Sequence, residues 1–178
     1  MEATSPGVLS RQKIEEMIDA TPPLITAMPD VGTQIQPNGV DITLEAVSSF
    51  EGCGTIAVSN DNRILPETVD LTYQADGSIH LPPGPYHVRF NEIVALPDWL
   101  MAYARPRSSL LRSGVALHTA VWDAGYSGRG ASLMVVYNPA GFTVHRNARI
   151  AQLVFHPLSS ATSGGYAGAY QHEGTPSG

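Results

Sequence analysis

Proline and glycine recur along most of this chain and leave few stretches long enough for a helix. The 178 residues include 14 prolines and 17 glycines, which favour turns and interrupt regular helices. Short segments between them alternate apolar and polar residues, as residues 40–47 do, and this alternation is typical of a half-buried strand. The sequence therefore predicts an all-β fold.

Only one helix is clearly predicted, a short amphipathic one at residues 8–18. Ser10 is a suitable N-cap, and Ile14, Met17 and Ile18 fall on one helical face. The prolines at positions 22 and 23 would end it.

The strongest strand candidates lie in the second half of the chain, at residues 114–117, 131–137 and 149–155. Two apolar runs within them, 133–136 and 150–155, are predicted to be buried on both faces. Residues 86–96 are expected to form a pair of strands. Residues 97–104 are expected to form either one helical turn or an extended connection.

The composition changes at residue 159, after which Ser, Gly, Ala, Thr and Tyr dominate. Such a segment cannot build a core alone. With no internal repeat and a length that suits one core, the chain is predicted to be a single domain over residues 1–178. Its core would span about 8–158 and a flexible, glycine-rich tail about 159–178.

The net charge and the cysteine content limit the ligands and the cellular compartment that we expect for this protein. A formal net charge of −6 and a pI near 5.4 argue against binding of a nucleic acid polymer, although a few arginines can still hold one nucleotide. The single cysteine, Cys53, excludes an intrachain disulfide and fits a reducing compartment. Without a signal peptide or an apolar run of about 18 residues, we expect a cytoplasmic protein that does not bind membranes.

Groups suited to phosphate are concentrated in residues 104–112. Three arginines and two serines lie there, namely Arg105, Arg107, Ser108, Ser109 and Arg112. Guanidinium forks, hydroxyls and the amides of a turn all bind phosphate oxygens well. Composition alone is equally compatible with a basic surface turn.

Three further polar residues stand in apolar surroundings. Asp123 starts a glycine-rich turn, where an aspartate is more often structural than catalytic. Asp41 lies in an alternating strand, so it either faces solvent, which the pattern favours, or pairs with a cation. Gln152 lies in a strand expected to be buried, so its amide needs partners from a structural network or from a ligand.

Several other kinds of chemistry are excluded because the sequence lacks the motifs that they require. The six histidines and Cys53 have no zinc-ligand spacing, which argues against zinc-type cytidine deamination. The chain also has no P-loop, no dinucleotide fingerprint and no G-x-S-x-G elbow.

Taken together, five segments resemble the motifs of dUTPases and dCTP deaminases. Residues 106–110 read P-R-S-S-L, as the second motif does. The others resemble the first motif (38–42), the third (119–128), the fourth (148–155) and the Y-x-G-x-Y-Q end of archaeal-type members (166–171). The resemblance spans roughly residues 8–172, in the family's order and spacing, and is greatest to the archaeal-type dUTP pyrophosphatases.

This resemblance implies a distorted β-barrel or jelly-roll-like (β-clip) subunit with one short N-terminal helix and a flexible tail. It also implies a homotrimer with its three active sites between subunits, and a tail that closes over bound nucleotide. A Mg²⁺ ion would be held mainly by substrate phosphates and waters.

The family contains enzymes of two activities, and a residue on one strand distinguishes them. The dCTP deaminases carry a glutamate after the third motif. Here that position falls on Val135 when aligned on the following Tyr-Asn, or on Leu133 when counted from Asp123. Neither side chain transfers protons. The sequence therefore favours hydrolysis of dUTP to dUMP and pyrophosphate; a dCTP deaminase, a bifunctional enzyme and a non-catalytic nucleotide-binding trimer are the alternatives.

The resemblance also assigns roles to residues. Asp123 would activate the attacking water, and Tyr126 would pack under the deoxyribose within a uracil-reading hairpin that starts at Val121. Arg107, Ser108 and Ser109 would hold phosphate. The other residues are given supporting roles: Arg112 at phosphate or between subunits, Gln152 at phosphate or behind it, Tyr166 and Tyr170 in the closing tail, and Asp41 as a structural support.

One departure from the family concerns charge. The tail has Ala169 where a lysine often precedes Tyr-Gln. Arg146 and Arg149 are the candidates to compensate for it.

Overall fold

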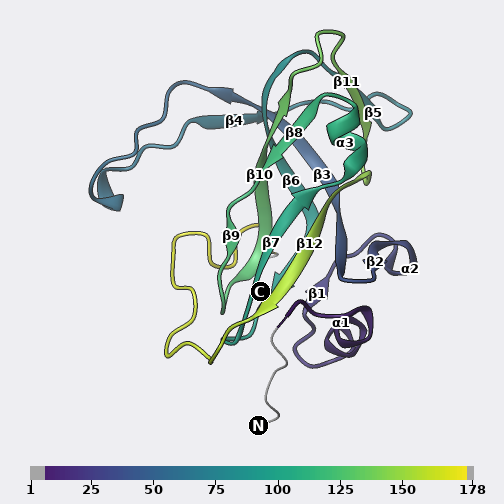
Figure 1. Cartoon of the computed structure of the whole chain (residues 1–178). Helices are drawn as coiled ribbons and strands as arrows, with labels where there is room; N and C mark the ends of the chain where they lie inside the picture. Colours follow the sequence, from purple (N-terminus) through teal and green to yellow (C-terminus); the bar gives the residue numbers. More distant parts are fainter. Residues whose placement is uncertain (1–6, 176–178) are drawn as a thin grey trace.

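A computed structural model describes residues 7–175 and consists mainly of one curled, antiparallel, ten-stranded sheet (Figure 1). Seven strands follow the order β8-β10-β6-β3-β12-β7-β9. They are β3 (Gly39–Glu51), β6 (Gly84–Ala95), β7 (Leu100–Pro106), β8 (Val115–His118), β9 (Val121–Trp122), β10 (Ser127–Val136) and β12 (Arg149–Pro157). The predicted all-β class is confirmed.

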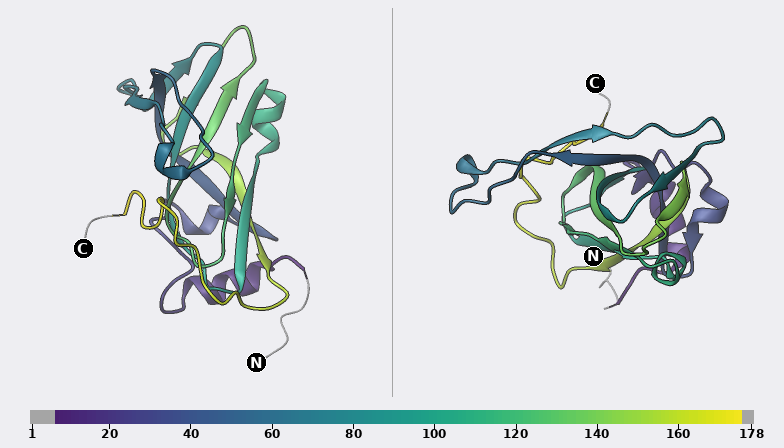
Figure 2. Two further views of the ribbon diagram at one scale, coloured as in Figure 1. Left: turned by 90° about the vertical axis from the view of Figure 1, so that its left-hand side faces the viewer. Right: turned by 90° about the horizontal axis from the view of Figure 1, so that it is seen from above.

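Five shorter strands complete the architecture. Three of them pair with β6 or β3: β1 (Ile25–Thr26), β2 (Ile35–Gln36) and β4 (Glu67–Asp70). Two more, β5 (Ser78–Leu81) and β11 (Phe142–His145), form a separate small sheet. Seen from above, the main sheet curls into a half-barrel around an apolar core to which Phe90 and Phe155 contribute (Figure 2).

The helices are short. The predicted one is confirmed as α1 (Arg11–Ile18), since the Ser10 hydroxyl accepts the Lys13 N–H at its start and Ile14 is fully buried. Three further helical segments had not been predicted: α2 (Val31–Gln34), the 3₁₀ turn η1 (Asn60–Asn62) and α3 (Ser108–Arg112). None of the helices between residues 7 and 175 has the length and apolarity that a membrane span needs.

Several local predictions are wrong. Residues 86–96 do not form a strand pair, because β6 runs through them without the break that a turn would require. For residues 97–104 the extended alternative holds from Leu100, where β7 begins after a hydrogen-bonded turn. The runs 133–136 and 150–155 are buried on one face only: Leu133 is 36% exposed and Val154 half-buried, because residues 7–175 leave that side of the sheet partly open.

A long excursion leaves the sheet between β3 and β4, and we call residues 51–66 the arm (Figures 1 and 2). A single bridge between Thr55 and Ile64 joins its two limbs. Its base is held by a bidentate ion pair from Arg89 to Asp70, with Nη–Oδ distances of 2.9 and 2.8 Å. The arm therefore projects from a firm base without a core of its own.

Candidate active site

Asp123 lies in the tight turn between β9 and β10. The Asp123 carbonyl accepts the Tyr126 N–H at 3.0 Å, and Gly125 has a φ of +80°, which favours glycine. The neighbouring Trp122 and Ala124 are buried, whereas the Asp123 side chain is exposed. The turn thus presents a carboxylate to solvent from an anchored backbone.

Two glycines of β10 make room for the aromatic rings of this hairpin. A Cβ on Gly130 would lie 2.7 Å from the Trp122 indole, and one on Gly128 would lie 2.7 Å from the Tyr126 hydroxyl. Both contacts are too short for any larger residue. The glycines therefore allow Trp122 and Tyr126 to lie flat against the strand.

Asp123 opens onto a cleft of about 570 Å³, a size that suits a small organic ligand. Five of the residues predicted for the site line it together, namely Val121, Asp123, Tyr126, Tyr166 and Tyr170. The base of the arm contributes another wall through Leu65 and Pro66. Aromatic rings, an exposed carboxylate and backbone groups thus meet in one hollow.

The tail, residues 159–175, lies against this hairpin within the same chain (Figure 1). The Tyr166 N–H donates to the Ala124 carbonyl at 2.8 Å, and the Tyr126 and Tyr166 rings meet edge to face at 5.5 Å. Gln171 accepts the Ser127 N–H and donates to the Gly125 carbonyl, both at 3.0 Å. The position of the tail is therefore fixed by its contacts with the turn that carries Asp123.

The structure separates the two positions considered for a deaminase glutamate. Leu133 lines the cleft and Val135 does not. His87 of β6 and His118 of β8 stand opposite Leu133 on either side, and both also line the cleft. Burial, and then Arg89, lowers the pKa of His87. An apolar side chain thus occupies the cleft between two histidines.

Besides Thr68 of β4, sequence reasoning missed four polar residues of the cleft: His87, His118, Ser132 and Glu173. The first three depend on strand register, which the sequence does not display. Glu173 lies beyond the tail motif, and burial raises the pKa of its carboxyl. The alternation of β6 gave a weak signal for His87 only.

The predicted phosphate-binding residues lie elsewhere. Arg107 is the N-cap of α3, and Ser108, Ser109 and Arg112 are exposed on that helix. No residue of the segment 105–112 lines the cleft. Figure 1 places α3 and β9 well apart on the molecule. One chain therefore does not bring the serine and arginine cluster to Asp123.

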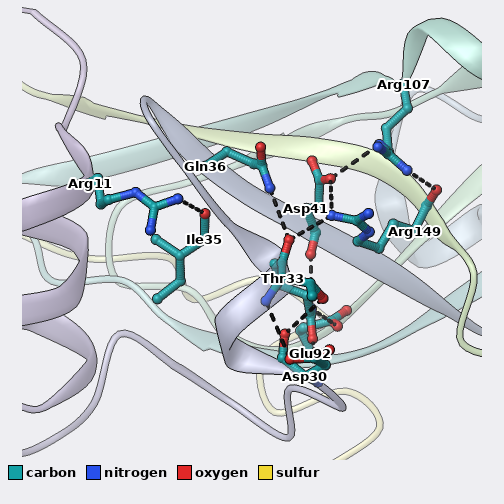
Figure 3. A network of polar contacts seen from close by, with 10 residues as sticks. Arg11, Asp30, Thr33, Ile35, Gln36, Asp41, Glu92, Arg107 and Arg149 are labelled. Atoms are coloured by element: carbon teal, nitrogen blue, oxygen red, sulfur yellow. Dashed lines mark hydrogen bonds and ion pairs between the residues drawn. The ribbon is translucent and has the colours of Figure 1, made fainter.

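The prediction that Asp41 faces solvent is wrong. Its side chain is almost fully buried (4% exposed), and its Oδ2 lies 3.1 Å from Arg107 Nε and 3.4 Å from Arg149 Nη1 (Figure 3). The prediction of a solvent-facing side chain is wrong because β12 lies beside β3 and places Arg149 next to Asp41. The alternative, pairing with a cation, is confirmed. Burial raises the pKa of Asp41, and both guanidiniums oppose that shift.

Further hydrogen bonds fix this cluster. Arg149 donates to the Thr33 carbonyl at 2.6 Å, and Arg107 donates to the Arg149 carbonyl at 3.4 Å (Figure 3). Behind them Gln34 donates to the Asp41 carbonyl at 2.8 Å and to the Glu92 carboxylate at 2.7 Å. Glu92 is buried, which raises its pKa. The arginines are thus held by a connected polar network.

Gln152 is half-buried rather than buried, because it lies on the uncovered face of β12. It pairs in register with Asp41 and packs beside Gly39. Its side chain therefore stands near the arginine cluster. Within residues 7–175, no group of three or more His, Cys, Asp or Glu side chains could hold a metal ion.

Comparison with known proteins gives consistent matches. A family described as dCTP deaminase-like matches residues 8–158. A probable deoxyuridine 5'-triphosphate nucleotidohydrolase of Methanosarcina mazei is 50% identical over 95% of this chain and 99% of that protein. One from Archaeoglobus fulgidus is 46% identical over 94% and 97%.

Among solved structures, the 2'-deoxycytidine 5'-triphosphate deaminase of Agrobacterium tumefaciens matches with a TM-score of 0.65 and 26% identity. The match covers 85% of this chain but 49% of the deaminase, so the chain spans about half of that protein's length.

Proposed function

Because the chain belongs to the dCTP deaminase-like family, we propose that it hydrolyses dUTP to dUMP and pyrophosphate. Relatives that it matches almost end to end bear the name of that activity as probable. The observation that carries the choice is that both candidate positions for a deaminase glutamate are apolar, Val135 and Leu133, and that Leu133 is the one that lines the cleft.

The chemistry assigned to Asp123 is activation of water. The Asp123 carboxylate accepts a proton from a water molecule whose oxygen bonds to the α-phosphorus. The bond from that phosphorus to the bridging oxygen breaks, and pyrophosphate leaves in line. An exposed carboxylate on an anchored turn supports this role. Tyr126 would pack against deoxyribose, and backbone groups after Val121 would read uracil.

The triphosphate would be bound by Arg107, Ser108, Ser109 and Arg112. Guanidiniums and hydroxyls suit phosphate oxygens rather than a metal ion. A Mg²⁺ ion would therefore be held through the phosphates and waters, where it neutralises charge on the triphosphate. Arg107 uses Nε and Nη1 for Asp41 and Arg149, and among residues 7–175 its Nη2 has no hydrogen bond, so this nitrogen can donate to phosphate.

The proposal further includes a homotrimer with sites between chains. The separation of α3 from the cleft supports it, because a second copy can bring the cations that the cleft lacks. The arm supports it as well: Ile56 is 80% exposed and Val58 fully exposed, and exposed apolar groups of this kind mark association surfaces.

A product assay tests the activity. Purified protein is incubated with Mg²⁺ and either dUTP or dCTP, and the products are separated. We expect dUMP and pyrophosphate from dUTP. Release of ammonia from dCTP would instead favour the deaminase or the bifunctional alternative, and no turnover of either would favour the non-catalytic one.

Asp123→Asn tests the mechanism. The amide keeps the shape but cannot accept the proton, so turnover should fall by about three orders of magnitude or more, with little change in nucleotide affinity. Unchanged turnover would remove Asp123 from the mechanism.

Mixing two inactive variants tests the shared site. Asp123→Asn and Arg112→Ala chains are unfolded together and refolded together, which allows mixed assemblies. Sites that combine one intact half from each chain should regain part of the activity. If the mixture stays as inactive as its parents, the site lies within one chain.

A further inference from the structure

The tail lacks a cation, and neither arginine proposed to compensate reaches the cleft. Ala169 precedes Tyr170 and Gln171, and the segment 159–178 contains neither lysine nor arginine. Arg149 is bound to Asp41 and to the Thr33 carbonyl. Arg146 lies over the ring of Tyr73, with 5.1 Å between its guanidinium carbon and the ring centroid. The compensating charge must come from another residue.

The cleft itself is poorly suited to an anion. Its lining includes the carboxyl groups of Asp123 and Glu173 and no lysine or arginine. Negative groups a few ångströms from a phosphate chain weaken its binding through Coulomb repulsion. A cation at the rim would offset that repulsion.

Arg63 is placed to be that cation. It lies on the arm directly after η1, and its guanidinium carbon is 5.3 Å from the centroid of the Tyr170 ring. Tyr170 lines the cleft, and its N–H donates to the Tyr166 hydroxyl at 3.4 Å. The arm thus carries a positive charge to the point where the tail meets the cleft.

The guanidinium of Arg63 is also free to bind an anion. None of the ion pairs found among residues 7–175 includes it. A contact with the face of a ring uses the charge of a guanidinium, and none of the hydrogen bonds described for residues 7–175 uses the N–H donors of the Arg63 side chain. The contact with Tyr170 therefore holds the charge in place without occupying its donors.

We propose that Arg63 binds the phosphate groups of the nucleotide and replaces the cation missing from the tail. This rests on the proposed function, because it concerns the same cleft. The interaction joins the arm to catalysis: the Arg89–Asp70 ion pair holds the base of the arm, and the arm positions Arg63 beside Tyr170.

The kinetic test compares Arg63→Gln with wild type. The Michaelis constant for dUTP should rise about ten-fold with kcat within about two-fold, because the contact forms on binding and persists in the transition state. Arg63→Lys should recover part of the loss, since it keeps the charge without the planar fork. The control is Arg11→Gln, which removes an arginine of α1 that does not line the cleft and should leave both constants unchanged.

A binding experiment separates phosphate recognition from simple support of the tail. Calorimetry measures the affinity of each variant for dUMP and for a non-hydrolysable α,β-imido analogue of dUTP. Arg63→Gln should weaken the analogue about ten-fold and dUMP by less than about two-fold, because dUMP lacks the distal phosphates. Equal weakening of both ligands would mean that Arg63 only holds Tyr170, and would overturn the proposal.

The two proposals fail in different ways. If wild-type protein does not hydrolyse dUTP, the proposed function is wrong, and the calorimetric comparison still decides whether Arg63 senses phosphate. If wild type is active and Arg63→Gln has an unchanged Michaelis constant and unchanged analogue affinity, only the assignment of Arg63 is wrong. Circular dichroism establishes that each variant is folded.

Discussion

Replacing Asp41 by asparagine should destabilise the protein strongly, although it removes only a charge. Asp41 is buried, and its carboxylate faces two guanidiniums, at 3.1 Å from Arg107 and 3.4 Å from Arg149. The amide keeps the volume and one oxygen. It leaves two positive groups close together with no counter-charge.

The magnitude follows from the distances. With an effective dielectric constant of about 20, each contact is worth about 5 kcal/mol of attraction. Desolvation of the carboxylate offsets most of this sum, because burial raises the pKa of Asp41 despite both guanidiniums. The cost of the substitution therefore comes from the two arginines, which keep their places without a counter-charge. Loss of one partner from a buried ion pair costs about 3–5 kcal/mol. Both arginines are about one-third exposed, with side-chain values of 35% and 33%, so we take the lower end, about 3 kcal/mol.

Chemical denaturation at pH 7 measures this change in the free energy of unfolding, and calorimetry should show a melting temperature lower by roughly 6–12 °C. Asp19→Asn, an exposed aspartate at the end of α1, is the control and should change stability by less than about 0.5 kcal/mol. If Asp41→Asn costs under about 1 kcal/mol, the arginines are not held by this carboxylate. The reasoning about the phosphate cluster would then fail.

Two further variants test the arm and the hairpin. Hydrogen bonds from Arg89, and then from Ser48, lower the pKa of Asp70 to about 2. Because this folded-state pKa lies below the unfolded-state value, ionised Asp70 stabilises the fold above about pH 4. That stabilisation is lost as the pH falls through about 2. The side chain is 54% exposed, so after solvent screening Asp70→Asn should cost about 1 kcal/mol at pH 7 and nothing near pH 2, and a loss that does not change with pH would contradict this. Gly130→Ala should lower the free energy of unfolding by about 1–3 kcal/mol in denaturant titrations and also lower turnover, because the added Cβ would lie 2.7 Å from the Trp122 indole. The control is Gly164→Ala, whose Cβ would meet nothing within 4 Å, and it should be neutral.

Local patterns predicted the fold class and most of the strands. Alternation and apolar runs identified β3, β10 and β12, because each signal lies within one segment. The split of β6 into two strands was wrong, since one polar position on the outer face does not interrupt pairing. The sequence could not show that β3 would be flanked by β6 and β12.

The candidate site shows the same division between local and distant information. The turn at Asp123 follows from a short segment. The pairing of Asp41 with Arg149 joins residues 108 positions apart, so no local pattern predicts it. Arg63 belongs to none of the five motifs, and its relation to Tyr170 depends on how the arm leaves the sheet.

Charge balance connects these separate features. Arg107 and Arg149 carry two positive charges against one on Asp41, so these three ion-paired residues contribute one net positive charge, and Arg112 on α3 adds a second. The cleft opposes them with Asp123 and Glu173. Neither surface alone is positive enough to hold a triphosphate in a chain of net charge −6. We therefore propose that capture of the triphosphate uses the arginine cluster of one copy, a metal ion carried by the phosphates and a cation at the rim of the cleft, where the arm places Arg63.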